Sequence, residues 1–243
     1  MQKMTKRIWL NEIFTSIEGE GILFGTKTMF VRMAGCHLKC LWCDTTYALP
    51  MNSGRNYTLD YAKNMISKHL QPNTYKVNFT GGEPLLQYEA VGELAKFVKE
   101  EKGLRTYIES SCFDSNKFER VLRYADICKI EFKMSDSNVV DAKHYDNLLS
   151  NEIQCLDLAI KNHKVTYIKV VITTSTDLLE FKNLSKNVFA RIKTTDLAGF
   201  IIQPSYAIHE PTVERLFNFY DVIYPIYQDV RIIPQLHKVI GVR

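Results

Sequence analysis

The segment Met29-Phe-Val-Arg-Met-Ala-Gly-Cys-His-Leu-Lys-Cys-Leu-Trp-Cys43 joins an apolar run to three closely spaced cysteines. The run at 29–33 predicts a strand, and Cys36, Cys40 and Cys43 follow its end. A chain that curls back after a strand can point three thiolates at one centre. Three thiolates can hold three corners of a 4Fe–4S cube and leave the fourth iron open to a small molecule, whereas ferredoxin-like carriers use four cysteines per cluster. The pattern therefore favours chemistry at the cluster over electron storage.

Two other interpretations of the triplet start from the same residues. Structural zinc needs four closed ligands, and His37 or a distant residue would have to be the fourth. Paired CxxC knuckles are the usual zinc signature, and the sequence has no second knuckle. A disulfide framework is disfavoured because Cys112, Cys128 and Cys155 are scattered along the chain and no secretory segment is recognisable. The spacing favours the cluster and leaves zinc open.

Bulk properties narrow the class of protein. The 243 residues suit a single domain spanning 1–243, and a hydrophobic fraction of 46% supplies material for a core. A net charge of +4 is too mild to predict a nucleic-acid partner. No apolar stretch approaches the ~18 residues that span a bilayer. The start, residues 1–7, has no apolar core typical of a signal peptide, so we expect a cytoplasmic protein with no membrane partner.

Apolar runs and helical patterns alternate along the chain, which predicts βαβ units and a parallel sheet. The count of about six or seven strands falls short of the eight that close a TIM barrel. Active sites of such sheets form at the carboxyl ends of the strands. A loop is expected at 50–56. Further strands are expected at 75–80, 105–109, 127–132, 167–173, 199–203 and 230–233, and helices at 59–70, 85–102, 116–124, 141–162, 177–190 and 212–220.

The sequence Gly81-Gly82-Glu83-Pro84 follows the strand that ends at Thr80. Two glycines permit backbone conformations closed to other residues and allow a ligand to approach the main chain. Glu83 adds a carboxylate beside exposed carbonyls, a combination suited to a ligand ammonium group. Taken alone, the sequence could equally be a plain strand-to-helix turn.

The Cx3Cx2C spacing, the aromatic Trp42 before the last cysteine, and Gly-Gly-Glu-Pro together resemble the radical S-adenosylmethionine enzymes. The resemblance implies that the three cysteines hold a 4Fe–4S cluster whose open iron is chelated by S-adenosylmethionine. Cleavage of that molecule by one electron gives a radical that abstracts hydrogen, so no side chain is catalytic by itself. The resemblance also implies that Gly81, Gly82 and Glu83 receive the methionine ammonium.

A narrower resemblance covers nearly the whole chain. Residues 12–21, 30–36, 42–45 and 230–237 are similar to the 7-carboxy-7-deazaguanine synthase family. This implies a partial, trimmed (β/α)6-type TIM barrel with a parallel curved sheet, an α/β fold. It also implies conversion of 6-carboxy-5,6,7,8-tetrahydropterin to 7-carboxy-7-deazaguanine with loss of ammonia, on the route to 7-deazapurines such as queuosine and archaeosine. A homodimer, magnesium and a reductase or flavodoxin-type electron donor are implied as well.

The same resemblance assigns roles to individual residues. A pterin presents N–H donors that carboxylates accept, Arg32 could pair with the substrate carboxylate, and the Thr45 hydroxyl is a hard ligand suited to magnesium. Cys112 replaces a usual glycine, and Glu131 stands where many members have serine and others aspartate. His209 and His237 receive no role. The implied substrate contacts are Ile17, Glu18, Gly19, Glu20, Arg32 and Ser110, and the implied cofactor contacts are Trp42, Asp44, Gly81, Gly82, Glu83, Cys112, Glu131, Lys133 and Gln203.

Two competing functions stay open at this point. A different radical S-adenosylmethionine enzyme, such as a glycyl-radical-activating protein, would share the cluster motif but not Glu18, Arg32, Thr45 and the C-terminal Pro-Gln-Leu-His together. A non-catalytic metal-binding module would carry zinc at the cysteines and bind a protein or RNA. Metal content separates the second from an enzyme.

Overall fold

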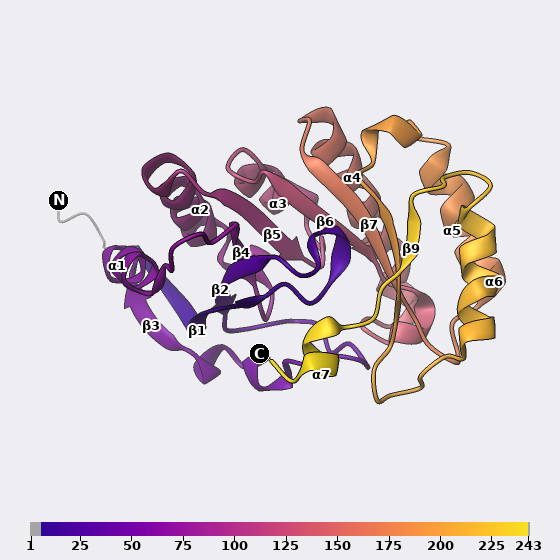
Figure 1. The fold of residues 1–243 in the computed structure, drawn as a ribbon, viewed down its shortest axis with the longest axis horizontal. Coiled ribbons are helices and arrows are strands. Elements are labelled where there is room, and N and C mark those ends of the chain that lie inside the picture. Colours follow the sequence, from indigo (N-terminus) through magenta and orange to yellow (C-terminus); the bar gives the residue numbers. More distant parts are fainter. Residues whose placement is uncertain (1–5, 243) are drawn as a thin grey trace.

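A computed structural model describes residues 6–242. Its strands form one open, curved sheet in the order β3-β1-β2-β4-β5-β6-β7-β8-β9 (Figure 1). The strands from β2 through β4 to β9 run parallel, whereas β1 is antiparallel to both β2 and β3. The bounds are β1 Arg7–Ile17, β2 Lys27–Met33, β3 Arg55–Thr58, β4 Lys76–Thr80, β5 Arg105–Ser110, β6 Ile127–Phe132, β7 Val165–Ile172, β8 Phe200–Pro204 and β9 Val230–Ile232.

Helices cover one face of this sheet. Figure 1 shows α1 to α6 along its outer side, while α7 lies apart from them, against the turn after β1. None of the helices within residues 6–242 is both long and apolar enough to cross a membrane. The bounds are α1 Leu59–His69, α2 Tyr88–Lys102, α3 Ser115–Leu122, α4 Ala142–Lys161, α5 Leu178–Phe189, α6 Val213–Ile223 and α7 Leu236–Ile240.

Side-chain caps explain where most of these helices begin. At each start a threonine or aspartate oxygen accepts a hydrogen bond from the backbone N–H three residues later, which satisfies one of the free donors of the first turn. The expected Thr58 cap of α1 is confirmed by its bond from the Tyr61 N–H. The other capping residues are Asp114, Asp141, Asp177 and Thr212.

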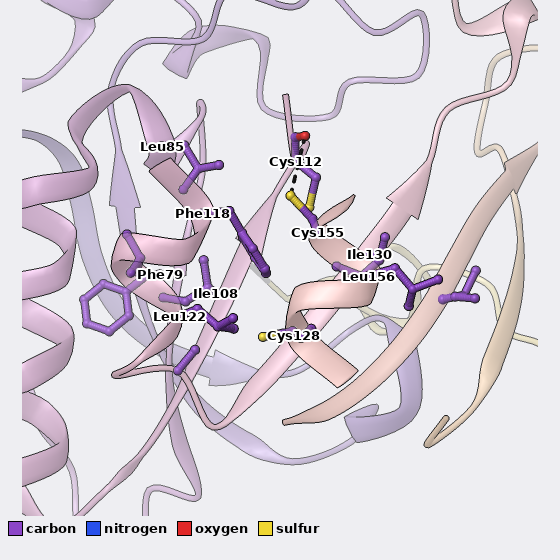
Figure 2. Close-up of a cluster of buried hydrophobic side chains, with 14 of the residues drawn as sticks. Phe79, Leu85, Ile108, Cys112, Phe118, Leu122, Cys128, Ile130, Cys155 and Leu156 are labelled. Carbon is purple, nitrogen blue, oxygen red and sulfur yellow. Dashed lines mark hydrogen bonds between the residues drawn. The ribbon is translucent and has the colours of Figure 1, made fainter. Parts of the chain in front are cut away.

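The main core lies between the sheet and the outer helices. Figure 2 shows part of it, where Phe79 and Ile108 from the sheet lie among side chains of α3 and α4. The cysteines that look scattered in the sequence, Cys112, Cys128 and Cys155, are free thiols buried in this same core. The Cys155 thiol donates to the Cys112 carbonyl oxygen at 3.8 Å (Figure 2). These cysteines therefore contribute to packing, and no disulfide forms within the described chain.

Most of the predicted strands and helices are confirmed, and the partial-barrel class with them. The elements that were not predicted are β1 and β3 near the N-terminus and α7 at the other end. The chain builds nine strands rather than six or seven, because β1 and β3 extend the parallel sheet at one edge. β3 also takes Arg55 and Asn56 from the expected loop at 50–56. The strand β1 was missed because its sequence does not alternate strictly between apolar and polar residues. Polar residues such as Glu12 line a cavity on one side of the strand, where a core strand would carry apolar residues. Residues 1–5, part of the segment analysed for a signal peptide, lie outside the described residues.

Candidate active site

A cavity of about 460 Å³ lies at the carboxyl ends of the parallel strands. It collects residues from the first strands, the cysteine loop and the C-terminus, which are far apart in the sequence. The structure thus brings nearly all the predicted site residues to one place, as the strand-end argument expects. Those that line it are Ile17, Glu18, Gly19, Glu20, Arg32, Cys36, Cys40, Trp42, Cys43, Asp44, Thr45, Gly81, Gly82, Glu83, Ser110, Glu131, Lys133 and Gln203.

Cys112 is the exception, because its side chain lies in the core outside the cavity. Its backbone has φ +57°, a left-handed conformation that costs a residue with a Cβ about 1–2 kcal/mol. Glycine adopts this conformation readily, so the geometry accounts for the glycine expected here. The cofactor contact expected at Cys112 is through the backbone, as at a glycine, and it stays a prediction.

The cysteine loop presents three thiols to the cavity. Cys36, Cys40 and Cys43 are free and half-buried, and the loop is held by bonds such as that from the Cys36 N–H to the Leu49 carbonyl, at 2.9 Å. Burial raises the pKa of Cys36 to about 11, so a metal bound there must displace a proton. His37, the nearest candidate for a fourth zinc ligand, is exposed and does not line the cavity. Its ring packs on that of Phe113, with 4.1 Å between the ring centroids. Three thiols without a fourth fit a cluster with one open iron better than structural zinc.

The two glycines after β4 allow this loop to approach. A Cβ on Gly82 would lie 2.2 Å from the Gly35 carbonyl oxygen, and one on Gly81 would lie 1.8 Å from Cγ of Arg32. Both glycines have positive φ. The Glu83 N–H donates to the same Gly35 carbonyl at 2.7 Å. The Gly-Gly pair therefore allows the end of β4 to pack directly against the segment that carries the cysteines. This packing role does not depend on a ligand.

The Glu83 carboxylate is strongly anchored. It is 1% exposed and accepts hydrogen bonds from the Leu85 N–H, the Ser110 hydroxyl and both the N–H and hydroxyl of Ser111, at 2.6–2.8 Å. The Ser110 hydroxyl also accepts from the Cys112 N–H at 2.9 Å. Glu83 thus ties the ends of β4 and β5 together. The ammonium contact predicted for Glu83 and the substrate contact predicted for Ser110 stay predictions.

A buried cluster of opposite charges forms one wall of the cavity. Glu131 accepts from Lys129 at 2.7 Å and from Lys133 at 2.5 Å, and its carboxylate lies 3.0 Å from Lys169. Although burial raises it, these three lysines hold the pKa of Glu131 well below its usual range. Glu109 accepts a hydrogen bond from the Lys129 ammonium group at 3.0 Å. Although burial raises the pKa of Glu109, Lys129 and Lys169 lower it to about 2.

The sequence offered a signal for part of this cluster. Lys129, Glu131 and Lys133 recur at every second position through the end of β6, so the three side chains share one face. Lys169 on β7 and Glu109 on β5 were missed, because only the pairing of the strands brings them to that face.

Glu20 and Arg32 line the same cavity and already have partners within the protein. Glu20 accepts from Lys169 at 2.7 Å and from Gln235 at 2.7 Å. Arg32 donates its Nε to Glu12 at 2.8 Å. Arg32 therefore forms an ion pair within the protein, although it also lines the cavity.

The C-terminal segment closes the rim of the cavity and gives His237 a partner that the sequence did not reveal. The Nε2 of His237 lies 3.1 Å from a carboxylate oxygen of Asp44, and Lys238 lies 3.8 Å from the same oxygen. Despite burial, these contacts lower the pKa of Asp44. Ligand atoms of Glu20, Asp44 and His237 lie within 4.8 Å of one another, so a cation could bind there, beside Thr45.

Comparisons with known proteins agree with this arrangement. Residues 17–155 match the family model described as a 4Fe-4S single cluster domain. The 7-carboxy-7-deazaguanine synthase of Methanocaldococcus jannaschii is 31% identical over 96% of this chain and 99% of its own length. That of Methanothermobacter thermautotrophicus is 29% identical over 96% of each chain.

Solved structures share the fold. QueE from Escherichia coli superposes with a TM-score of 0.62 at 17% identity, covering 95% of both chains. A radical SAM methyltransferase from Sphaerobacter thermophilus also gives 0.62, at 13% identity, over 86% of this chain and 66% of its own. The open, partly parallel sheet is thus an architecture that this chain shares with radical SAM proteins.

Proposed function

Since this chain belongs to the 7-carboxy-7-deazaguanine synthase family of radical S-adenosylmethionine enzymes, we propose that it converts 6-carboxy-5,6,7,8-tetrahydropterin to 7-carboxy-7-deazaguanine with loss of ammonia. The observation that carries this proposal is one cavity that holds both the cysteine triplet and the Glu18 and Glu20 carboxylates. A cluster-binding end and a pterin-binding end in the same space suit a radical reaction on a bound pterin. The product would enter 7-deazapurine biosynthesis.

Cofactor binding falls to the cysteine side of the cavity. Cys36, Cys40 and Cys43 would hold a 4Fe–4S cluster, which together with S-adenosylmethionine supplies the radical that removes a hydrogen atom from the substrate. Lys133, which lines the cavity near the Cys40 thiol, would meet the cofactor carboxylate or ribose. The contribution of the protein is placement, electrostatics and exclusion of water.

Substrate binding falls to the other side. Glu18 and Glu20 would accept the N–H donors of the pterin ring, and Arg32 would pair with its carboxylate. Thr45 would bind Mg²⁺, a hard cation that prefers oxygen ligands, with substrate oxygens and water completing its shell. The nearby Asp44 and Glu20 carboxylates favour a cation in this corner.

The proposal extends to partners and compartment. A homodimer, a flavodoxin-type or reductase electron donor and a cytoplasmic setting follow from the family resemblance. A radical enzyme of this class needs an external electron for each activation, which is the chemical reason to expect a protein donor.

An anaerobic turnover assay tests the reaction. Reconstituted protein, dithionite, S-adenosylmethionine and Mg²⁺ are mixed with 6-carboxytetrahydropterin, and the products are identified by mass spectrometry. The proposal expects 7-carboxy-7-deazaguanine without net consumption of S-adenosylmethionine. Formation of 5′-deoxyadenosine alone would move the assignment to another radical enzyme, and bound zinc without iron and sulfide would sink the enzyme proposal.

Matched cysteine variants make the assay specific. Cys40→Ala is expected to lose the brown colour and all cleavage of S-adenosylmethionine. Cys128→Ala, which alters a core thiol outside the cavity, should keep both. Thr45→Ala is expected mainly to weaken the response to Mg²⁺, and an unchanged response would remove Thr45 from the magnesium site.

A further inference from the structure

Lys76 is a fully buried lysine that the proposed function leaves without a role. It lies on β4, and its side chain is 0% exposed. Its ammonium group donates to Oε2 of Glu18 and, at 2.8 Å, to the Thr28 hydroxyl. Because removing a lysine from water is costly, such a residue is retained only with a partner that compensates its charge.

Glu18 has fewer ion-pair partners than its neighbour in the charged cluster. Glu131 pairs with Lys129, Lys133 and Lys169, whereas among the described residues Glu18 pairs with Lys76 alone. Burial raises the pKa of Glu18, and the neighbouring carboxylates Glu109 and Glu20 raise it further against the opposing effect of Lys76. Removing Lys76 would leave this buried carboxylate without its ion-pair partner.

The remaining groups around the pair carry no compensating charge. The Asn78 amide lies 3.5 Å from Oε2 of Glu18, and the Tyr107 ring lies 4.9 Å from the Lys76 ammonium. The Tyr107 hydroxyl contacts the Tyr167 hydroxyl at 2.5 Å, and burial raises the pKa of both well above the usual value, so both stay neutral. No other described residue can replace Lys76 as the counter-charge of Glu18.

The two carboxylate oxygens of Glu18 have different hydrogen-bond partners. Oε2 is taken by Lys76, whereas Oε1 has no hydrogen-bond partner among residues 6–242, and Glu18 lines the cavity. We propose that Lys76 is a positioning residue that holds Oε2 of Glu18 and so turns Oε1 toward the N–H edge of the pterin, without touching the substrate itself. The inference rests on the proposed function and adds to it how the acceptor is oriented.

The chemistry of the pterin edge makes the charge of Glu18 decisive. An N–H donor needs an acceptor, and a protonated carboxyl presents an O–H donor in competition with it. Lys76 holds Oε2 of Glu18 and leaves Oε1 free to accept from the pterin. Loss of Lys76 removes the contact that fixes this carboxylate and should therefore weaken substrate binding.

The test measures KM and kcat for 6-carboxytetrahydropterin, using the full chain with its cluster reconstituted. We expect Lys76→Met to raise KM about tenfold, the effect of one charge-assisted hydrogen bond, while kcat changes less. Lys99→Met, which removes a partly exposed partner of Asp126 outside the cavity lining, should leave both KM and kcat unchanged.

A double-mutant cycle covers the case in which Lys76→Met fails to load its cluster. Lys76→Met/Glu18→Gln removes both charges and so leaves no unpaired ion in the core. If the pair acts as a unit, the double variant has the KM of Glu18→Gln alone. Additive increases in KM, or an unchanged KM for Lys76→Met, would overturn the inference. A wild-type protein that does not turn over the pterin would instead overturn the proposed function.

Discussion

Single atoms decide how the cysteine loop meets the sheet. Gly82 has φ +44°, and the Gly35 carbonyl oxygen occupies the place where its Cβ would be. The same carbonyl receives the Glu83 N–H, so the contact is part of a hydrogen-bonded junction between two loops. Gly82, which the sequence motif assigns to ligand binding, is thus also required for the packing of the two loops.

Gly82→Ala should therefore destabilise the junction. The left-handed backbone costs about 1–2 kcal/mol, and the 2.2 Å approach to backbone adds to it because the carbonyl cannot rotate away. We expect a lower melting temperature and a reduced iron content after reconstitution, measured by circular dichroism and iron analysis. Gly92→Ala is the control: a Cβ there meets nothing within 4 Å in α2, and the change should stabilise the helix by about 0.5–1 kcal/mol. Equal behaviour of the two variants would contradict this account.

At the scale of elements, the first turn of α5 links the helical layer to the cavity. Asp177 caps the helix by accepting the Glu180 N–H at 2.7 Å. Glu180 in turn accepts from both the N–H and the hydroxyl of Ser135, in the loop that follows Lys133. The position of α5 is thus transmitted to the strand end that carries a cofactor candidate.

Loss of the Asp177 cap should lower the free energy of unfolding by about the contribution of one hydrogen bond. Asp177→Ala is expected to lower the free energy of unfolding by about 1 kcal/mol, which in a chain of this size lowers the melting temperature by roughly 2–4 °C. Thermal unfolding followed by circular dichroism measures it. Asp177→Asn keeps an acceptor at the same place and should retain most of the stability. A loss as large in the asparagine variant would show that charge, not capping, is responsible.

At the scale of the whole molecule, the C-terminus completes a site that begins at the first strand. The Leu236 N–H donates to the Gly19 carbonyl at 2.9 Å, and the His237 ring occupies the space beside Gly19, where a Cβ would meet it at 2.2 Å. The helix α7 contains no buried residue. It therefore adds little to the core and serves mainly to wall the cavity.

Ending the chain after Gln235 should separate stability from binding. We expect a melting temperature close to that of the full chain, because no core residue is removed, and a raised KM for the pterin, because the contacts of His237 and Lys238 with Asp44 are lost. Phe219→Ala is the contrasting variant: Phe219 is 1% exposed in the core, so its loss should cost about 3–5 kcal/mol. An unchanged KM in the shortened chain would show that α7 does not belong to the site.

The sequence by itself determined the periodic elements, the cysteine triplet and the Gly-Gly-Glu-Pro turn, because spacing along one chain controls helix caps, strand faces and local loops. From these, the strand-end rule placed nearly every candidate residue at one edge of the sheet. The residues that the sequence did not reveal share one physical reason. Lys76, Lys169 and His237 acquire partners only when strands pair and the C-terminus folds back, so each looks like an ordinary lysine or histidine in the sequence.

The tertiary structure alone decided which charges meet and which are left to a ligand. The pairing of β5, β6 and β7 surrounds Glu131 with lysines, while Glu18, directly after the unpredicted strand β1, pairs with Lys76 alone among the described residues. Burial magnifies this difference, because an ion removed from water depends on its few remaining neighbours. Those neighbours come from positions many residues apart, and the sequence holds no local pattern that pairs them.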